Sequence, residues 1–193
     1  STTTERVRLT SNGDFIFLGG TLNIGDDLPV SGAGVRMFFD SKTVSFRAGY
    51  VASTQWDVAN IGNYSVAFGQ STIASGTNTY ASGKTATASG NFSFAHGDTV
   101  TASGSSSVVF GDNTSATANY AFGAGHLSDA TGTASVAMGE AADASGGSSV
   151  AMGETMQAKG NNSIAIGHGA IASGANSIVL GRNATAGDGT AGS

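Results

Sequence analysis

The sequence predicts an all-β fold of stacked coils, a parallel β-solenoid, and three observations lead to this prediction. A short pattern, such as NYSVAFG at residues 63–69, recurs through most of the chain. The pattern returns at a regular spacing of about 14 residues. Within it, small and large side chains alternate as they do along a β-strand. A fixed repeat defines units that are completed only by their neighbours, so the pattern predicts an elongated array of coils.

A glycine closes the first strand of each unit and gives the period of the repeat. These glycines are Gly69, Gly83, Gly97, Gly111, Gly123, Gly139, Gly153, Gly167 and Gly181. They are evenly spaced, except that the interval before Gly123 is short by two and the interval after it is long by two. Because the two irregular intervals together equal two regular units, we expect a turn shortened by two residues at 112–115 and a turn lengthened by two at 124–131.

Each unit is long enough for two short strands and two turns. Nine such coils, stacked at the inter-strand spacing of about 4.8 Å, make a rod on the order of 40 Å long. We expect this solenoid at residues 63–186 and a glycine-rich tail or linker at 187–193. Residues 1–62 lack the period but alternate like short strands, for example at Val35–Phe39 and Val44–Arg47, and are expected to form a β-rich N-terminal cap.

The two faces of the five-residue strand differ in side-chain size. In the first unit Ser65 and Ala67 share one face, and Val66 and Phe68 share the other. A coil of two short strands has room inside only for small side chains, so the large residues must point outward. Over the whole repeat the outward residues form two apolar columns: Val66, Phe68, Tyr80, Phe94, Val108, Phe110, Tyr120, Phe122, Val136, Met138, Val150, Met152, Ile164, Ile166, Ile178 and Leu180.

These apolar columns predict that the chain has partners. At roughly 2 kcal/mol per buried side chain, their burial represents on the order of 30 kcal/mol. Monomers rarely leave such a large apolar surface in contact with water. Identical chains are the simplest partners, so we expect self-association through this face.

Composition argues against several other classes of protein. Charged residues make up 11% of the chain, the formal net charge is −5, and no basic stripe is present, so we expect no nucleic-acid partner. There is no cysteine for thiolate metal sites, and no apolar run approaches the ~18 residues that span a bilayer. We expect no cofactor, and a coil-built acyltransferase would show a six-residue period. The start at Ser1 leads us to expect a piece of a longer protein.

The repeats resemble a known family, the YadA-like heads of trimeric autotransporter adhesins. The resemblance covers residues 63 to about 186 and rests on the small-large alternation before a glycine, the spacing and the number of copies. It implies a homotrimer of left-handed, single-stranded parallel β-rolls in which the apolar columns form the trimer core. It also implies a non-enzymatic extracellular segment, on a bacterial cell surface or a phage fibre, that attaches to host matrix protein, glycans or other cells.

A second function stays open beside attachment. The rod could be a structural spacer or shaft whose binding tip lies elsewhere, and arrays of matrix proteins and glycans would separate the two. A multivalent head can turn modest affinities into firm attachment, whereas a shaft needs no ligand. An ice-binding solenoid would require a regular Thr ladder, and the outer position of the second strand varies among Ile73, Thr87 and Asp143.

Two polar residues, Ser82 and His96, interrupt the apolar columns in successive units. On the implied three-fold axis, three copies of His96 would face one another and could hold water, an anion or a metal ion. The simpler interpretation is a water-satisfied polar layer, so we assign no metal ligand.

An exposed row of charge and one turn are further candidates for a site. The residue after the closing glycine is Gln70, Lys84, Asp98, Asp112, Glu140, Glu154, His168 or Arg182 in the regular units. We expect this row to be solvent-exposed, with ion pairs that contribute little individually. The lengthened turn would project beyond its neighbours, which makes it the candidate recognition loop: Gly125, His126, Leu127, Ser128 and Asp129.

Overall fold

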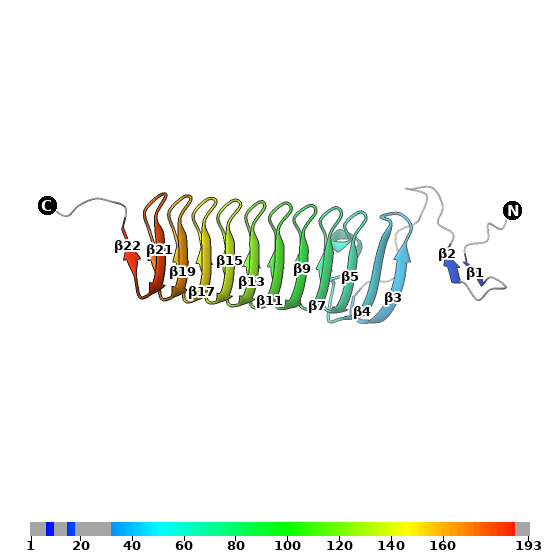
Figure 1. Ribbon diagram of the computed structural model, residues 1–193. Coiled ribbons are helices and arrows are strands. Elements are labelled where there is room, and N and C mark those ends of the chain that lie inside the picture. The colour runs from blue at the N-terminus through cyan, green and yellow to red at the C-terminus, as the bar shows by residue number, and fades with distance from the viewer. Residues whose placement is uncertain (1–6, 10–14, 18–31, 188–193) are drawn as a thin grey trace.

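The chain forms a straight rod of stacked coils. The computed structural model describes residues 7–9, 15–17 and 32–187. In this part of the chain every element is a β-strand except one three-residue 3-10 helix, η1 (Val58–Asn60). Each strand of the repeat lies beside its counterpart in the next coil, and the coils follow one another along a single axis (Figure 1). The predicted parallel β-solenoid is therefore confirmed.

A long sheet of 11 strands runs along one side of the rod. Its strands pair in parallel, except for the antiparallel pair of β3 and β4 at one end. The strands are β3 (Gly34–Asp40), β4 (Ser45–Val51), β5 (Val66–Gln70), β7 (Tyr80–Lys84), β9 (Phe94–Asp98), β11 (Val108–Asp112), β13 (Phe122–His126), β15 (Val136–Glu140), β17 (Val150–Glu154), β19 (Ile164–His168) and β21 (Ile178–Arg182).

A second, narrower sheet of nine two-residue strands forms the other side of the coil. These strands are β6 (Ile73–Ala74), β8 (Thr87–Ala88), β10 (Thr101–Ala102), β12 (Ser115–Ala116), β14 (Asp129–Ala130), β16 (Asp143–Ala144), β18 (Gln157–Ala158), β20 (Ile171–Ala172) and β22 (Thr185–Ala186). One long and one short strand make each coil, which gives the nine coils expected from the repeat. Separately, β1 (Val7–Leu9) and β2 (Phe15–Phe17) pair in antiparallel fashion.

The repeat is more regular than the glycine count predicts. Gly125, and not Gly123, pairs with Gly111 on one side and with Gly139 on the other, so the closing glycine recurs at one constant spacing without interruption. Gly123 takes the inward place that alanine or valine takes in the neighbouring strands. The predicted shortened and lengthened turns are therefore wrong, because a glycine at an inward position was mistaken for the glycine that ends the strand.

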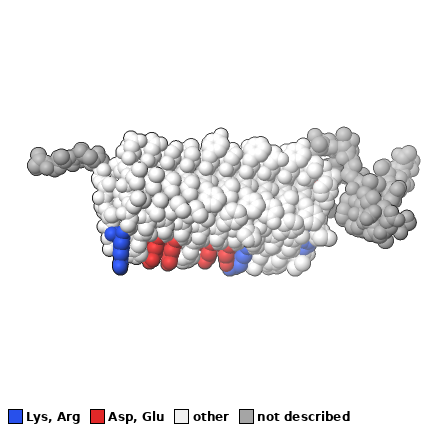
Figure 2. Space-filling view, in the orientation of Figure 1, with Lys and Arg blue, Asp and Glu red and all other residues white. Residues whose placement is uncertain are grey.

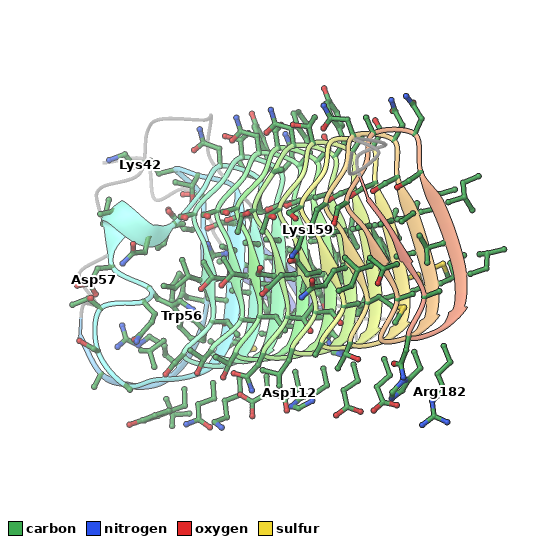
Figure 3. All side chains as sticks on the ribbon, turned by 90° about the vertical axis from the view of Figure 1, so that its left-hand side faces the viewer. Lys42, Trp56, Asp57, Asp112, Lys159 and Arg182 are labelled. Atoms are coloured by element: carbon green, nitrogen blue, oxygen red, sulfur yellow. The ribbon has the colours of Figure 1, made fainter. Side chains whose placement is uncertain are left out.

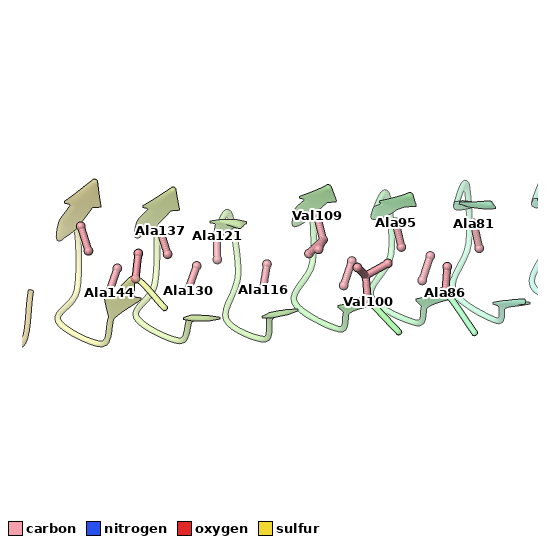
Figure 4. Packing of buried hydrophobic residues seen from close by; sticks show 14 of the residues in the cluster. Ala81, Ala86, Ala95, Val100, Val109, Ala116, Ala121, Ala130, Ala137 and Ala144 are labelled. Atoms are coloured by element: carbon pink, nitrogen blue, oxygen red, sulfur yellow. The ribbon is translucent and has the colours of Figure 1, made fainter. Parts of the chain in front are cut away.

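The interior of each coil is filled by small side chains from both sheets. The long strands contribute an Ala, such as Ala67, the residue before the strand contributes a Ser, such as Ser65, and the short strands contribute an Ala, such as Ala74; all three are fully buried. Figure 4 shows alanines of the long strands, such as Ala137, pointing into the coil toward alanines of the short strands, such as Ala130. The inward orientation predicted for the Ser/Ala face is thus confirmed, and it explains why the large residues of the same strands face outward.

One interior column, contributed by the residue before each short strand, varies in size. Its largest member, Met156, lies between the small Ala142 and Ala170, whereas Val100 lies between Ala86 and Thr114. All of these residues are buried, and Thr114 alone among them is polar. Small neighbours above and below provide the volume that a large side chain needs in a close-packed interior.

We expect the change Met156→Ala to lower the free energy of unfolding by about 3 kcal/mol. Met156 is fully buried, and its neighbours Ala142 and Ala170 are too short to fill the space that its removal leaves. Chemical denaturation would measure the loss. Met156→Leu is the matched control, since it conserves volume and should cost less than about 1.5 kcal/mol; equal losses for the two variants would contradict this packing.

A buried arginine closes the coil interior at the end nearest β4. Arg47 takes in β4 the inward place that Ala67 takes in β5. Its guanidinium donates hydrogen bonds to the carbonyl oxygens of Ser65, at 2.9 Å, and Ala74, at 3.0 Å. Burial lowers the pKa of Arg47 to about 10, while the charge of Asp40 opposes the shift. The side chain therefore remains charged at neutral pH and ties both sheets together.

Trp56 fills the same end of the rod from the segment between β4 and η1 (Figure 3). The indole Nε1–H donates to the carbonyl oxygen of Thr72 at 2.9 Å, and the ring meets Phe38 edge to face, with centroids 6.1 Å apart. The strands expected at Val35–Phe39 and Val44–Arg47 are present as β3 and β4. The division into cap, solenoid and tail stays a prediction.

Candidate functional site

The outward face of the long sheet carries two columns of side chains. The first column consists of Phe46, Val66, Tyr80, Phe94, Val108, Phe122, Val136, Val150, Ile164 and Ile178. The second consists of Ala48, Phe68, Ser82, His96, Phe110, Ala124, Met138, Met152, Ile166 and Leu180. We call this surface the apolar face. Neither column contains Asp, Glu, Lys or Arg. Most members of both columns are only partly buried and remain accessible to solvent in the single chain.

The observed strand register differs from the predicted columns at two residues: one changes column and the other lies outside both columns. Phe122 pairs with Val108 and Val136, so it belongs to the first column and not the second. The second-column place in that coil is taken by Ala124. Tyr120 lies in the turn before β13 and is outside both columns, because the glycine count shifted this unit by two residues. The other predicted members occupy the columns.

Large and small residues alternate between the two columns of the apolar face. Tyr80 lies beside Ser82 on β7, and Phe122 lies beside Ala124 on β13. No described coil places two Phe or Tyr residues in its pair of columns. The aromatic rings instead contact one another between coils, as in the stacked pair of Tyr80 and Phe94, with centroids 4.8 Å apart. The rings therefore form a continuous series of contacts along the apolar face from β4 to β13.

Ser82 and His96 form the polar break in the second column that the sequence indicated. The Oγ atom of Ser82 lies 2.7 Å from Nδ1 of His96, in the next coil, so the two side chains share a hydrogen bond. Ser82 is buried, whereas His96 is exposed in the single chain and meets Phe110 edge to face. The two polar residues are therefore paired with each other inside an otherwise apolar face.

The apolar face continues onto the antiparallel hairpin. Val35, Met37 and Phe39 of β3 are exposed, and they pair with Tyr50, Ala48 and Phe46 of β4 on the same side of the sheet. The apolar face thus extends past the first coil of the repeat into the predicted cap.

A row of charged residues follows the edge of the long sheet where its strands end. Figure 2 shows Lys and Arg at either side of a group of Asp and Glu along this edge, and Asp112 and Arg182 lie on it in Figure 3. Lys84 and Asp98 form an ion pair at 3.0 Å. Hydrogen bonds from Lys84 and Thr99 lower the pKa of the Asp98 carboxyl. The predicted exposed charge row is present, and such exposed pairs add little to stability.

The regular register also places His126 in this row. Its Nε2 atom lies 3.8 Å from a carboxylate oxygen of Asp112, and Nε2 of His168 lies 3.5 Å from Glu154. Within the described residues, no group of three or more His, Asp or Glu side chains is arranged to hold a metal ion.

The predicted recognition loop does not project from the rod. Gly125 and His126 end β13, Ser128 is buried, and Asp129 begins β14, so only the Leu127 turn remains, with the same length as the turns of neighbouring coils. The premise of a longer turn is therefore wrong. A recognition role for residues 125–129 stays a prediction.

The sequence analysis missed a row of exposed aromatic residues at the opposite edge of the long sheet. Tyr64, Phe92 and Tyr120 each lie two residues before a long strand, in alternate coils, and all have a left-handed backbone. The signal was present in the sequence as an Asn-aromatic pair in every second repeat, at 63–64, 91–92 and 119–120. Because Gly123 was mistaken for the glycine that ends the strand, Tyr120 was assigned to that strand and the pattern was not recognised.

Fold and surface together define a β-solenoid repeat protein with one continuous apolar face. The YadA head domain repeat matches residues 61–81, 74–98, 102–122, 130–153 and 158–184. The chain therefore belongs to the YadA head repeat family, whose members are adhesin-type structural heads. No curated protein matches the chain. In the described residues no helix has the length and hydropathy needed to cross a membrane.

Proposed function

We propose that this chain is a non-enzymatic segment of a homotrimeric surface adhesin, displayed outside the cell, that attaches to host matrix protein, glycans or other cells. The observation that carries the proposal is the apolar face, which runs from β3 to β21 without a charged residue in either column. A single rod leaves this face in water. Three rods that share it about a common axis bury it, and membership of the YadA head repeat family supports the number three.

The shape of the apolar face supports packing of identical chains in register. One column or the other carries a Phe or Tyr in every long strand from β4 to β13, whereas β15 to β21 carry Val, Ile, Leu and Met. Sliding one chain by a coil would bring rings against rings at some layers and leave gaps at others. Overpacking and cavities both destabilise an interface, so the in-register trimer is favoured.

Attachment would be tested with the trimer of residues 1–193 on arrays of matrix proteins and glycans. A head that attaches should bind at least one ligand class, with an apparent affinity that drops when the protein is converted to single chains, because three copies act together. If a trimer of correct mass bound no ligand on any array, the attachment function would be refuted. A structural spacer or shaft on a bacterial or phage fibre would then be favoured.

We further propose that Ser82 and His96 form a polar layer in the trimer core. Each pair satisfies part of its own hydrogen-bonding capacity, and the remaining His96 nitrogen faces the shared interface. The layer then favours the in-register trimer, since the polar atoms of the three chains can hydrogen-bond to one another only when the chains are aligned.

We expect His96→Leu alone to lower the melting temperature, because it leaves the buried Ser82 hydroxyl without its partner. The double variant Ser82→Ala and His96→Leu should leave the melting temperature unchanged or raise it, because both hydrogen-bonding partners are then replaced by apolar groups. Thermal unfolding should also be the same with and without a chelator. A wild-type melting temperature that falls on chelation, in a way that His96→Leu removes, would contradict the polar layer and indicate a bound metal ion instead.

A further inference from the structure

We infer that Tyr64, Phe92 and Tyr120 form a binding platform for a neutral, extended, β-linked polysaccharide. We call these three residues the aromatic row. The inference deepens the proposed function by naming a ligand class and a surface for it, and it depends on that function for its biological setting. It uses the edge of the long sheet opposite the charged row.

The aromatic row is not explained by the folding of the single chain. The rings are 47%, 62% and 66% exposed, in chain order, so they contribute little to the core. Their φ angles are +57°, +60° and +61°. A bulky side chain is rare in this region and raises the free energy of the folded state, whereas Asn and Gly adopt it readily.

In the other coils, the turn before the long strand carries small or polar residues at the position of the aromatic row. The same place has a φ of +54° to +60° in the other coils, where it is occupied by Asn78, Ser106, Ala134, Ser148, Asn162 or Asn176. The coil geometry enforces this backbone at the turn whatever the residue, so what distinguishes these three coils is a large exposed aromatic side chain where the other coils carry a small or polar one.

The backbone holds the aromatic row in fixed positions. The N–H of Phe92 donates to the carbonyl oxygen of Thr77 at 2.8 Å, and that of Tyr120 donates to Ser105 at 2.9 Å. Each donor and its acceptor lie in adjacent coils, so the sheet spacing also sets the spacing of the turns. Second-neighbour coils are about 9.6 Å apart, which makes the whole row about 19 Å long.

This spacing matches the geometry of an extended sugar polymer. In a β-1,4-linked glycan every second ring presents the same face, and such rings are separated by a distance close to that between second-neighbour coils. Aromatic side chains bind through large, rigid faces that lose little conformational entropy. Stacking alternate sugar rings on Tyr64, Phe92 and Tyr120 would therefore bind five successive sugars.

Polar groups beside the rings can hydrogen-bond to sugar hydroxyls. The Oδ1 atoms of Asn91 and Asn119 accept hydrogen bonds from the backbone N–H groups of Thr77 and Ser105, at 3.0 and 2.9 Å. Their Nδ2 groups take no part in these bonds and are donors at an exposed surface. Asn78 and Ser106 lie between the rings, and no charged residue occurs among residues 63–64, 77–78, 91–92, 105–106 and 119–120. These features favour a neutral glycan.

The test is calorimetric titration of the wild-type protein with chitohexaose, cellohexaose and maltohexaose. We expect binding of at least one of the first two, which are extended and β-linked, and no measurable binding of maltohexaose, whose α-linkages curve the chain. Absence of binding to both β-linked hexasaccharides, or equal binding of maltohexaose, would overturn the inference.

The decisive variant carries Tyr64→Asn, Phe92→Asn and Tyr120→Asn. Asn suits the left-handed backbone, so this variant should melt at the same or a higher temperature while losing the hexasaccharide. Each single substitution should weaken binding by about threefold to tenfold. Thr155→Asn is the matched control: Thr155 is exposed, has φ +54° and lies outside both the row and residues 125–129, so binding should not change.

Three further outcomes separate this inference from the proposed function. If the triple variant binds the hexasaccharide as well as the wild type, the aromatic row is not the platform. If the triple variant has a lower solution mass, the row contacts a neighbouring copy of the chain and the inference is wrong. Attachment to a matrix protein without glycan binding would preserve the proposed function and refute the platform alone.

Discussion

Replacing Gly139 by alanine is expected to prevent the rod from folding. Gly139 has φ +132°, a conformation that L side chains rarely adopt. A Cβ atom there would overlap the carbonyl oxygen of Gly153 in the next coil and lie 2.8 Å from its carbonyl carbon. Backbone cannot rotate away as a flexible side chain can, so we expect a loss of more than about 4 kcal/mol. Circular dichroism and chemical denaturation would measure it.

Gly147→Ala is the matched control for this substitution. Gly147 lies in the turn after β16, and the nearest atom to an added Cβ is Oδ1 of Asn161, at 3.4 Å. The substitution should be neutral or should stabilise the fold slightly, by restricting the unfolded chain. If Gly139→Ala folded as well as Gly147→Ala, close contact between the coils at the closing glycine would be disproved.

Placing charge on the apolar face is expected to separate the chains. In the double variant Ile164→Asp and Ile166→Asp, both outward residues of β19 become carboxylates, so a trimer would hold six of them in one layer. An unpaired buried charge costs about 3–5 kcal/mol, and like charges at close range add to this. The solution mass should fall to that of single chains, while the β-sheet circular dichroism signal is retained.

The matched control places a carboxylate on the outer side of the nine-stranded sheet, away from the apolar face. Ile171 faces outward from β20, in the same coil as β19. Ile171→Asp should leave the solution mass unchanged, because it lies outside the apolar face. Dissociation by Ile171→Asp, together with retention of the oligomer by the β19 variant, would show that the chains meet through the nine-stranded sheet.

The architecture could be predicted from the sequence because the repeat constrains it twice. The period fixes the length of the coil, and the alternation within the strand fixes which side chains fit inside. Ser65 and Ala67 face inward for the reason predicted, since the coil is too narrow for Val66 or Phe68. The resemblance to the family added expectations about the number of chains that periodicity does not supply.

The errors arose where one residue type can occupy two structural roles. Gly123 and Gly125 are both plausible strand ends in sequence, and only the pairing of Gly125 with Gly111 and Gly139 decides between them. The wrong choice placed Tyr120 in a column and created a lengthened turn that does not exist. A test for strict periodicity over the whole chain would have favoured Gly125.

Other features depend on three-dimensional contacts that the sequence does not display. Nothing in the pattern shows that Arg47 would enter the coil interior, because an arginine among apolar residues usually marks an exposed position. Its burial depends on the carbonyl oxygens of Ser65, directly before β5, and Ala74, in β6 of the same coil. The hydrogen bond between Ser82 and His96 likewise requires the register of adjacent coils.

Light scattering on the wild-type chain at micromolar concentration tests most directly whether the apolar face is shared among copies. The proposal predicts a mass three times that of the 18.9 kDa chain. A folded, stable species with the mass of one chain would contradict it, because the apolar face would then be exposed to water in the native protein.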